Sequence, residues 1–304
     1  KVIGLFSFFT FQQYLTCSIL FTVVTAIGLW RLYATLCTLY PSVYKILALG
    51  ILFYPSLGIW GSGILKDPLT LCCVGLIFSS TYSIINGRKY LISIFYIVLS
   101  SYFCLILKPY ILYTFIPIML LWAQGQISGK LENPVVKGVL TPLIVIVFGI
   151  GGFFAIDSVS SGAGKYSLES VQSVAEGFQS WHTYLAETRD QSGYSLGEIS
   201  FTPLGILKKS PEGFFVTYYR PFIIGDVRNV ATLFEALQNL ILFVLTIFVI
   251  LRVGIIKFMK ITFSNSNVRA FMLFAVVFGV AVGITSYNFG ALSRYKIPGV
   301  HFFV

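Results

Sequence analysis

Seven ionisable side chains stand at the ends of long apolar runs, and their types are those that bind phosphates and transfer protons. They are Lys66, Asp67, Lys108, Arg220, Glu235, Arg294 and Lys296. Arginine recognises a phosphate with two parallel hydrogen bonds, lysine offers a point charge, and a carboxylate can accept a proton from a hydroxyl. Charges at membrane depth are costly and commonly mark ligand or ion pathways. This set is therefore the candidate site.

Each of these residues also has a purely structural explanation. Asp67 precedes Pro68, and an acidic cap followed by proline is a common helix start. The lysines of the set and Arg294 could extend their long side chains to the membrane interface. Arg220 could be held at the interface by its aromatic neighbours, and Glu235 could make polar contacts between helices. The hypothesis of a site therefore depends on whether the seven side chains lie on the same side of the membrane.

The composition indicates a protein that crosses the membrane several times. Of 304 residues, 57% are hydrophobic and only 11% are charged, which leaves too little charge for the surface of a soluble domain. The apolar segments are continuous and lack the alternation of a membrane barrel. We therefore expect an all-α, polytopic transmembrane helix bundle. The net charge of +10 fits cytoplasmic loops and lipid head groups, so we expect membrane lipids as partners and no nucleic acid.

Hydropathy predicts about eight spans in this chain. Their approximate ranges are 10–30, 44–62, 68–86, 90–107, 108–123, 139–156, 234–251 and 269–287. The range 108–123 is short and contains two prolines, so we expect it to be tilted or kinked.

Basic residues orient these spans. Alternate loops carry Arg31, Lys45, Arg88, Lys89, Lys130, Lys137, Arg252, Lys257, Lys260 and Arg269. The positive-inside rule assigns these loops to the cytoplasm. All seven candidate residues then face outward, together with the long segment 157–233.

The chain divides into three predicted regions, namely a membrane bundle 1–156, an extracytoplasmic loop region 157–233 and membrane helices 234–304. The loop region holds eight of the eleven acids: Asp157, Glu169, Glu176, Glu187, Asp190, Glu198, Glu212 and Asp226. Apolar residues from Val171 to Leu185 recur at spacings of three and four, which predicts a short amphipathic helix on the membrane surface or a small external cap. Because the chain begins with Lys1 and ends in an apolar stretch, we expect it to be part of a longer protein.

Metal and nucleotide chemistry are not indicated. The two histidines, His182 and His301, lack ligand spacing, and the five cysteines fit as small apolar fillers. The sequence GSGILK at Gly61–Lys66 lacks the spacing of a phosphate-binding loop. We therefore expect neither a metal nor a cofactor.

Four short phrases resemble those of a known group of enzymes: WGSGILKDPLTL, LKPY, YYRPF and GALSRYKIP. Together they resemble the membrane-embedded C-type glycosyltransferases of the bacterial envelope, related to protein mannosyltransferases and aminoarabinose transferases. In that group a span commonly starts with an acidic residue, proline and leucine, as in Asp67–Leu69. A later outer turn often reads like Arg294–Pro298. The resemblance covers about 50–125 and 285–300.

The resemblance implies transfer of a sugar from a polyprenyl phosphate at the outer face of the bacterial plasma membrane. Arg294, Lys296 and Arg220 would then contact the phosphate, with Lys66 and Lys108 as further substrate-binding residues. Asp67 is the candidate base, and Glu187 and Glu235 are the alternatives. The resembled enzymes usually carry their catalytic base, an acidic residue, just after the first span, and no acidic residue directly follows the first span here. Either that residue lies in sequence upstream of this chain, or the chain is similar to lipid-linked oligosaccharide polymerases.

Two other classes of function are open. A transporter or flippase for an anionic lipid would need ionisable residues near the bilayer centre and two related halves, and the sequence has neither. A non-enzymatic membrane protein would scatter the outer charges instead of grouping them.

Overall fold

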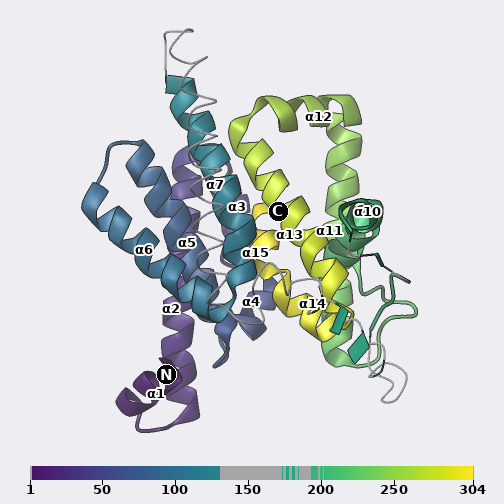
Figure 1. Cartoon of the computed structure of the whole chain (residues 1–304), viewed down its shortest axis with the longest axis horizontal. Helices are drawn as coiled ribbons and strands as arrows, with labels where there is room; N and C mark the ends of the chain where they lie inside the picture. The colour runs from purple at the N-terminus through teal and green to yellow at the C-terminus, as the bar shows by residue number, and fades with distance from the viewer. Residues whose placement is uncertain are drawn as a thin grey trace. The chain divides into compact units, whose positions relative to one another are not determined.

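The computed structural model describes residues 2–130 and 202–303, together with 173, 176–177, 180–181, 184, 193–197 and 199–200. These residues are almost entirely helical (Figure 1). Within the described part, six helices are long and apolar enough to cross a membrane. Large apolar side chains such as Leu91 and Leu251 are 87% and 77% exposed. Such surfaces are stable against lipid but not against water, so the chain is a multi-pass membrane protein.

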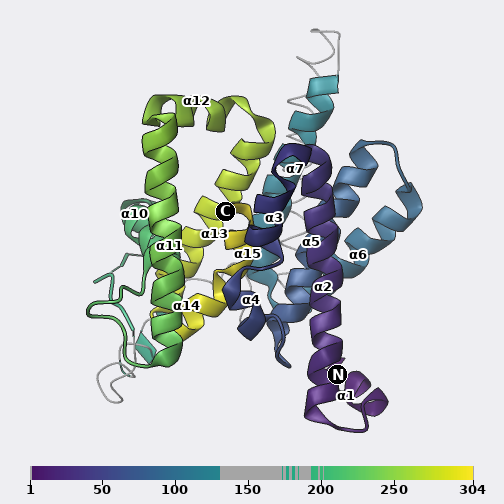
Figure 2. The same cartoon turned by 180° about the vertical axis from the view of Figure 1, so that it is seen from behind.

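Two compact units make up the chain, Lys1–Leu112 and Tyr113–Val304. The first unit contains α1 (Val2–Phe9), α2 (Tyr14–Leu39), the 3₁₀ turn η1 (Pro41–Val43), α3 (Tyr44–Ile51), α4 (Pro55–Trp60), α5 (Lys66–Ile85) and α6 (Tyr90–Leu107). In both Figure 1 and Figure 2, α2, α5 and α6 run alongside one another, and α5 packs against both of the others.

Small residues bring α2 and α5 close together. A Cβ atom at Gly28 would overlap the backbone of Cys72, and one at Gly75 would overlap the backbone of Gly28. Helices in membranes commonly associate through such small residues, because close backbone approach increases van der Waals contact where no hydrophobic driving force exists. A hydrogen bond also joins α2 to the end of α4: Thr25 Oγ1 donates to the carbonyl of Gly61 at 2.9 Å.

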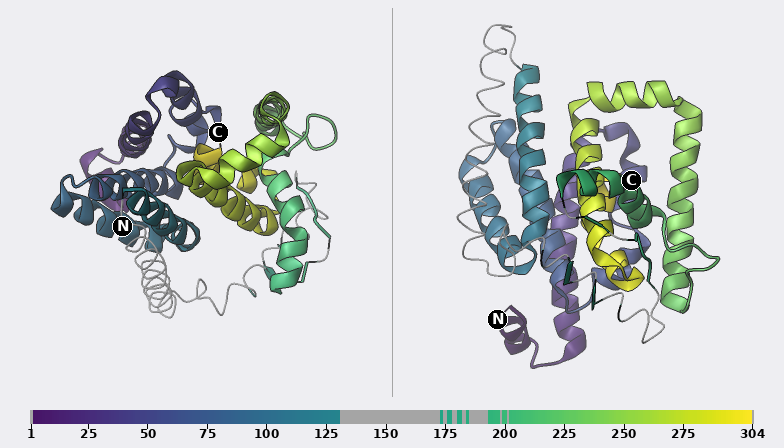
Figure 3. Two further views of the ribbon diagram at one scale, coloured as in Figure 1. Left: turned by 90° about the horizontal axis from the view of Figure 1, so that it is seen from above. Right: turned by 45° about the vertical axis from the view of Figure 1, so that its right-hand side comes forward.

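The second unit is also built from helices. It contains α7 (Pro109–Lys130) from Tyr113 onward, α10 (Pro203–Tyr219), α11 (Val230–Val253), α12 (Ile255–Ser264), α13 (Ser266–Ser286), α14 (Phe289–Tyr295) and α15 (Ile297–Phe303). Figure 2 shows α12 joining one end of α11 to one end of α13. Figure 3 shows α10 lying across α13, where Thr217 Oγ1 donates to the carbonyl of Gly279 at 2.7 Å.

Caps fix where the long helices of this unit begin. The side chain of Asn229 accepts from the amide of Thr232 at 2.9 Å, and the amide of Asn229 donates to Thr232 Oγ1 at 3.1 Å, which closes a capping box at the start of α11. Asn265 accepts from the amides of Asn267 and Val268 at the start of α13. Gly254 ends α11 at a φ of 81°, a conformation that glycine adopts without strain.

One predicted span is not a single helix. The range 44–62 holds two short helices, α3 and α4, that are separated around Tyr54 instead of one continuous helix. The cause is Pro55, which forces the preceding residue into an extended conformation, with φ −64° and ψ 121° at Tyr54. Neither helix is long enough to cross a bilayer alone.

The other predicted spans differ mainly at their ends. The prediction for 90–107 coincides with α6, whereas α7 continues to Lys130 and is longer than the predicted 108–123, with Pro117 inside the helix. The predicted span 139–156 lies outside the described residues. Within the predicted loop region, the described residues between 173 and 184 are helical, and α10 adds a 17-residue helix. The boundaries at 156 and 233 stay predictions.

Candidate functional site

The first candidate group is a buried ion pair in the first unit. Asp67 lies in the first turn of α5, and Lys108 follows the last residue of α6. Lys108 Nζ donates to Asp67 Oδ1 at 2.5 Å, and the two residues are 6% and 3% exposed. Paired charges of this kind are stable in the interior only as long as both partners are present.

This pairing corrects two of the structural explanations. Asp67 is not the N-cap of α5: the helix begins at Lys66, its N-cap is Leu65, and the carboxylate of Asp67 accepts from Lys108. Lys108 does not extend to an interface, since it is buried against that carboxylate. Lys66, by contrast, is exposed, as expected of a lysine that reaches the interface.

The second candidate group is centred on Lys296 in the second unit. Lys296 lies between α14 and α15 and is completely buried. Its Nζ atom donates to Asn239 Oδ1 at 2.6 Å and lies 3.6 Å from Glu235 Oε2. Glu235 and Asn239 are four residues apart on α11, so both side chains point from one face of that helix. Burial lowers the pKa of Lys296, and the neighbouring Glu235 opposes this shift.

Arg220 joins the second group through its backbone. Asn239 Nδ2 donates to the carbonyl of Arg220 at 2.6 Å, which connects the residue after α10 to α11. The guanidinium of Arg220 donates to Asp226 from Nε, at 2.9 Å, and from Nη2, at 2.5 Å. Two of the five N–H groups of an arginine are used in such a fork, which leaves three for other contacts.

Aromatic rings surround the Arg220 guanidinium. Its central carbon lies 5.3 Å from the ring centre of Phe289 and 6.0 Å from that of Tyr194. Tyr194 is fixed in turn, because its hydroxyl donates to the carbonyl of Gly283 at 2.7 Å. Burial raises the pKa of the Tyr194 hydroxyl, so it stays neutral at physiological pH. Arg220 is therefore a partly exposed cation held by a carboxylate and by π-faces.

The pair Arg220–Asp226 makes stability depend on pH. Burial alone would raise the pKa of Asp226, but hydrogen bonds from Arg220 and from the amide of Phe222 outweigh burial and lower it. A carboxyl whose pKa is depressed in the folded state stabilises that state above its unfolded pKa, and the stabilisation is lost as the pH falls through the folded pKa. We expect the free energy of unfolding in detergent to decrease below about pH 4.

Asp226→Asn is expected to remove this pH-dependent stabilisation. The free energy of unfolding should fall by about 1 kcal/mol or less, because the Arg220 side chain is partly exposed. The check is denaturant titration at a series of pH values, with Glu212→Gln on the exposed face of α10 as the control. An Asp226→Asn variant with the same decrease of stability in acid as the unaltered protein would contradict the assignment.

The remaining predicted residues are placed as follows. Arg294 lies in α14, partly exposed, with its guanidinium 5.2 Å from the ring centre of Tyr295. Glu187 lies outside the described residues. In the part of the chain that the structure describes, no three His, Cys, Asp or Glu side chains group as a metal site would require.

The predicted site thus divides into two groups, one in each unit. Asp67 and Lys108 form the first, and Glu235, Lys296 and Arg220 belong to the second. A pocket shared by all of them stays a prediction. No role was predicted for Asp226 or Tyr194, although the turn at Gly225, five residues after Arg220, indicates a short loop that could bring a carboxylate back to the guanidinium.

Comparison of the chain with protein-family models, with curated proteins and with solved structures gives no significant match.

Proposed function

We propose that this protein is an integral membrane glycosyltransferase that uses a polyprenyl-phosphate-linked sugar at the outer face of the bacterial plasma membrane. One observation carries the proposal: the carboxylate of Glu235 lies beside Lys296 in a buried network that reaches the backbone of Arg220, and the sequence predicts that both basic residues serve a phosphate. A base beside cations is what glycosyl transfer from a phosphate needs.

The reaction assigns a distinct task to each group. Glu235 takes the proton of the acceptor hydroxyl while the hydroxyl oxygen forms a bond to the anomeric carbon. The bond from that carbon to the phosphate oxygen breaks, and the polyprenyl phosphate leaves with the electron pair. Arg220 stabilises the negative charge on the departing phosphate with the N–H groups that Asp226 does not use.

Lys296 acts through Glu235 in this mechanism. It has no exposed surface, whereas Glu235 is 5% exposed, so an acceptor would reach the carboxylate before the ammonium. The ammonium lies 3.6 Å from the carboxylate and donates to Asn239 on the same face of α11, so it holds the carboxylate in place. Lys296 is thus a positioning residue. Glu235 is preferred to Asp67 as the base because Lys108 donates directly to Asp67 at 2.5 Å, whereas Lys296 lies 3.6 Å from Glu235.

The test is sugar transfer by the purified chain in detergent, with a radiolabelled polyprenyl-phosphate hexose as donor. Glu235→Gln keeps the size of the side chain and is expected to lower turnover by about 10²- to 10⁴-fold, the usual contribution of a general base. Glu212→Gln, an exposed change on α10, is expected to leave turnover unchanged. Turnover in Glu235→Gln equal to that of the unaltered protein would remove Glu235 from the mechanism.

A polymerase of lipid-linked oligosaccharides would use the same groups, and it would yield a ladder of products instead of one added sugar.

A transporter of anionic lipids is a second candidate because of two features of the first unit. The segment between α2 and α5 is interrupted at Tyr54, and a buried ion pair, Asp67–Lys108, lies at the ends of long helices. Interrupted helices and buried charges are typical of transporters. Movement of a labelled polyprenyl phosphate across proteoliposomes, without sugar transfer, would favour this candidate over the enzyme.

A further inference from the structure

A polar pocket of about 250 Å³ opens among α2, α5 and α6, apart from the residues used above. It is lined chiefly by two cations, three serines and a tyrosine: Arg31, Lys89, Ser80, Ser83, Ser93 and Tyr96. None of the lining residues is acidic. Within the described residues, neither Arg31 nor Lys89 forms an ion pair. The described residues therefore leave the positive charge of this pocket without an acidic partner.

One of the two cations stands at the beginning of α6. Lys89 is the N-cap of this 18-residue helix and Ser93 lies in its first turn, so the pocket adjoins the positive end of the helix. The guanidinium of Arg31 comes from α2 and lies 5.6 Å from the ring centre of Tyr96 on α6. Ser80 and Ser93 are buried hydroxyls on two different helices. Guanidinium, ammonium and hydroxyl groups around a helix N-terminus are the donors that a phosphate oxygen accepts from.

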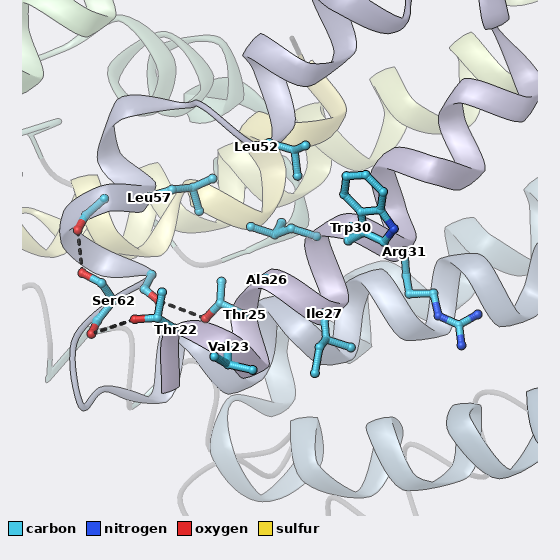
Figure 4. Close-up of a pocket in the computed structure, with 13 residues that line it drawn as sticks. Thr22, Val23, Thr25, Ala26, Ile27, Trp30, Arg31, Leu52, Leu57 and Ser62 are labelled. Carbon is cyan, nitrogen blue, oxygen red and sulfur yellow. Dashed lines mark hydrogen bonds between the residues drawn. The ribbon is translucent and has the colours of Figure 1, made fainter. Parts of the chain in front are cut away.

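An apolar groove shares Arg31 with this pocket. The groove has a volume of about 670 Å³ and runs along α2 between Thr22 and Arg31, with the segment 52–62 as its other wall. Figure 4 shows Arg31 at one end of the groove and the hydrogen bond of Thr22 with Ser62 at the other. Nine residues of helix separate these ends, about 14 Å at 1.5 Å per residue. Apart from its ends the groove is lined mainly by aliphatic side chains and Trp30, which suit a hydrocarbon chain.

We propose that the polar pocket binds a phosphate group, and that its source is an anionic phospholipid whose chain occupies the groove. The positive-inside rule predicts Arg31 and Lys89 on the cytoplasmic side, where anionic lipids attract basic residues. A free phosphate ion offers the same oxygens to the pocket but has no chain to fill the groove. The two sources can therefore be separated by experiment. This site is independent of the proposed glycosyl transfer, which uses residues of the second unit.

The test measures binding of phosphatidylglycerol and of inorganic phosphate to the purified full chain in detergent, by native mass spectrometry. The Arg31→Gln/Lys89→Asn variant removes both cations, and asparagine tolerates the φ of 48° at position 89. We expect it to bind phosphatidylglycerol about tenfold or more weakly. Arg88→Gln changes a neighbouring exposed cation that does not line the pocket, and it is expected to change the affinity less than twofold.

Chain length identifies the source of the phosphate. Tighter binding of dioleoyl than of dihexanoyl phosphatidylglycerol, lost in the double variant, supports the lipid. Binding of inorganic phosphate that is lost in the double variant, with lipid binding unchanged, overturns the lipid and keeps the phosphate site.

Binding of both probes by the double variant as by the unaltered protein overturns the site itself. Ser93→Ala removes a buried hydroxyl donor without a change of charge. It is expected to weaken phosphatidylglycerol binding severalfold, and it tests the site even if the double variant does not fold.

Discussion

Replacing Lys296 with methionine is expected to lower the free energy of unfolding by about 3–5 kcal/mol. Methionine has a similar length and fits an apolar interior, so the substitution removes the charge without leaving a large cavity. What remains is the Glu235 carboxylate, which is 5% exposed and would lose the ammonium 3.6 Å away. Asn239 would lose the hydrogen bond that Lys296 donates to its side-chain oxygen. The measurement is denaturant titration of the purified protein in detergent.

Lys209→Met supplies a matched control. Lys209 also pairs with a glutamate, Glu212, with its Nζ atom at 3.0 Å from the carboxylate. The lysine and glutamate side chains are 27% and 54% exposed, however, so water replaces whatever the substitution removes. The expected loss is about 1 kcal/mol or less. If Lys296→Met and Lys209→Met lower the free energy of unfolding equally, then the buried Glu235 needs its lysine no more than the exposed Glu212 does.

A second substitution separates the lost charge from lost packing. In Lys296→Met/Glu235→Gln no unpaired charge remains, so most of the stability lost in Lys296→Met should return. If the double variant is as unstable as Lys296→Met, the defect comes from the shape of the methionine side chain. The same variants also test the enzymatic proposal, because Lys296→Met should lower turnover if Lys296 holds Glu235 in position.

Glycine and proline residues that interrupt helices explain which helices could be predicted from the sequence. The predicted span 90–107 and α6 coincide because Gly87 and the Lys108–Pro109 step interrupt the chain on either side of it. The predicted span 44–62 forms two short helices instead of one because hydropathy averages over Pro55, whose effect on the preceding residue is purely conformational. Long apolar runs therefore predict where helices lie, and prolines inside those runs decide whether one helix or two form.

The partners of the charged residues could not be predicted in the same way. Asp67 and Lys108 are 41 residues apart, and Asn239 and Lys296 are 57 residues apart. Their pairing depends on how helices pack, and no local pattern encodes that. These charges stand out in the sequence only because a charge beside a long apolar run is energetically costly. Asp226 could not be singled out in this way, because it lies in a polar segment where an acid is ordinary. Only the structure shows that it pairs with Arg220.

Gly75→Ala is expected to destabilise the first unit by about 3 kcal/mol or more, because it adds one methyl group where two backbones touch. The added Cβ atom would overlap the backbone of Gly28 on α2, and a Cβ at Gly28 would overlap Cys72 in the same way. Overpacking typically costs about 1–3 kcal/mol when side chains can adjust. Backbone atoms cannot rotate away, so α2 and α5 must separate along their whole contact, and the expected loss lies at or above the top of that range. The check is denaturant titration in detergent.

Gly58→Ala is the control that separates this clash from the effect of alanine itself. Gly58 lies in α4 of the same unit, and a Cβ atom built there has no neighbour within 4 Å. Since alanine favours helix more than glycine does, Gly58→Ala should be neutral or stabilise by about 0.5–1 kcal/mol. The contrast between the two variants isolates the α2–α5 contact, on which α5 depends to present Asp67 to Lys108. If Gly75→Ala is as stable as Gly58→Ala, α2 and α5 are not held together by this close approach of their backbones.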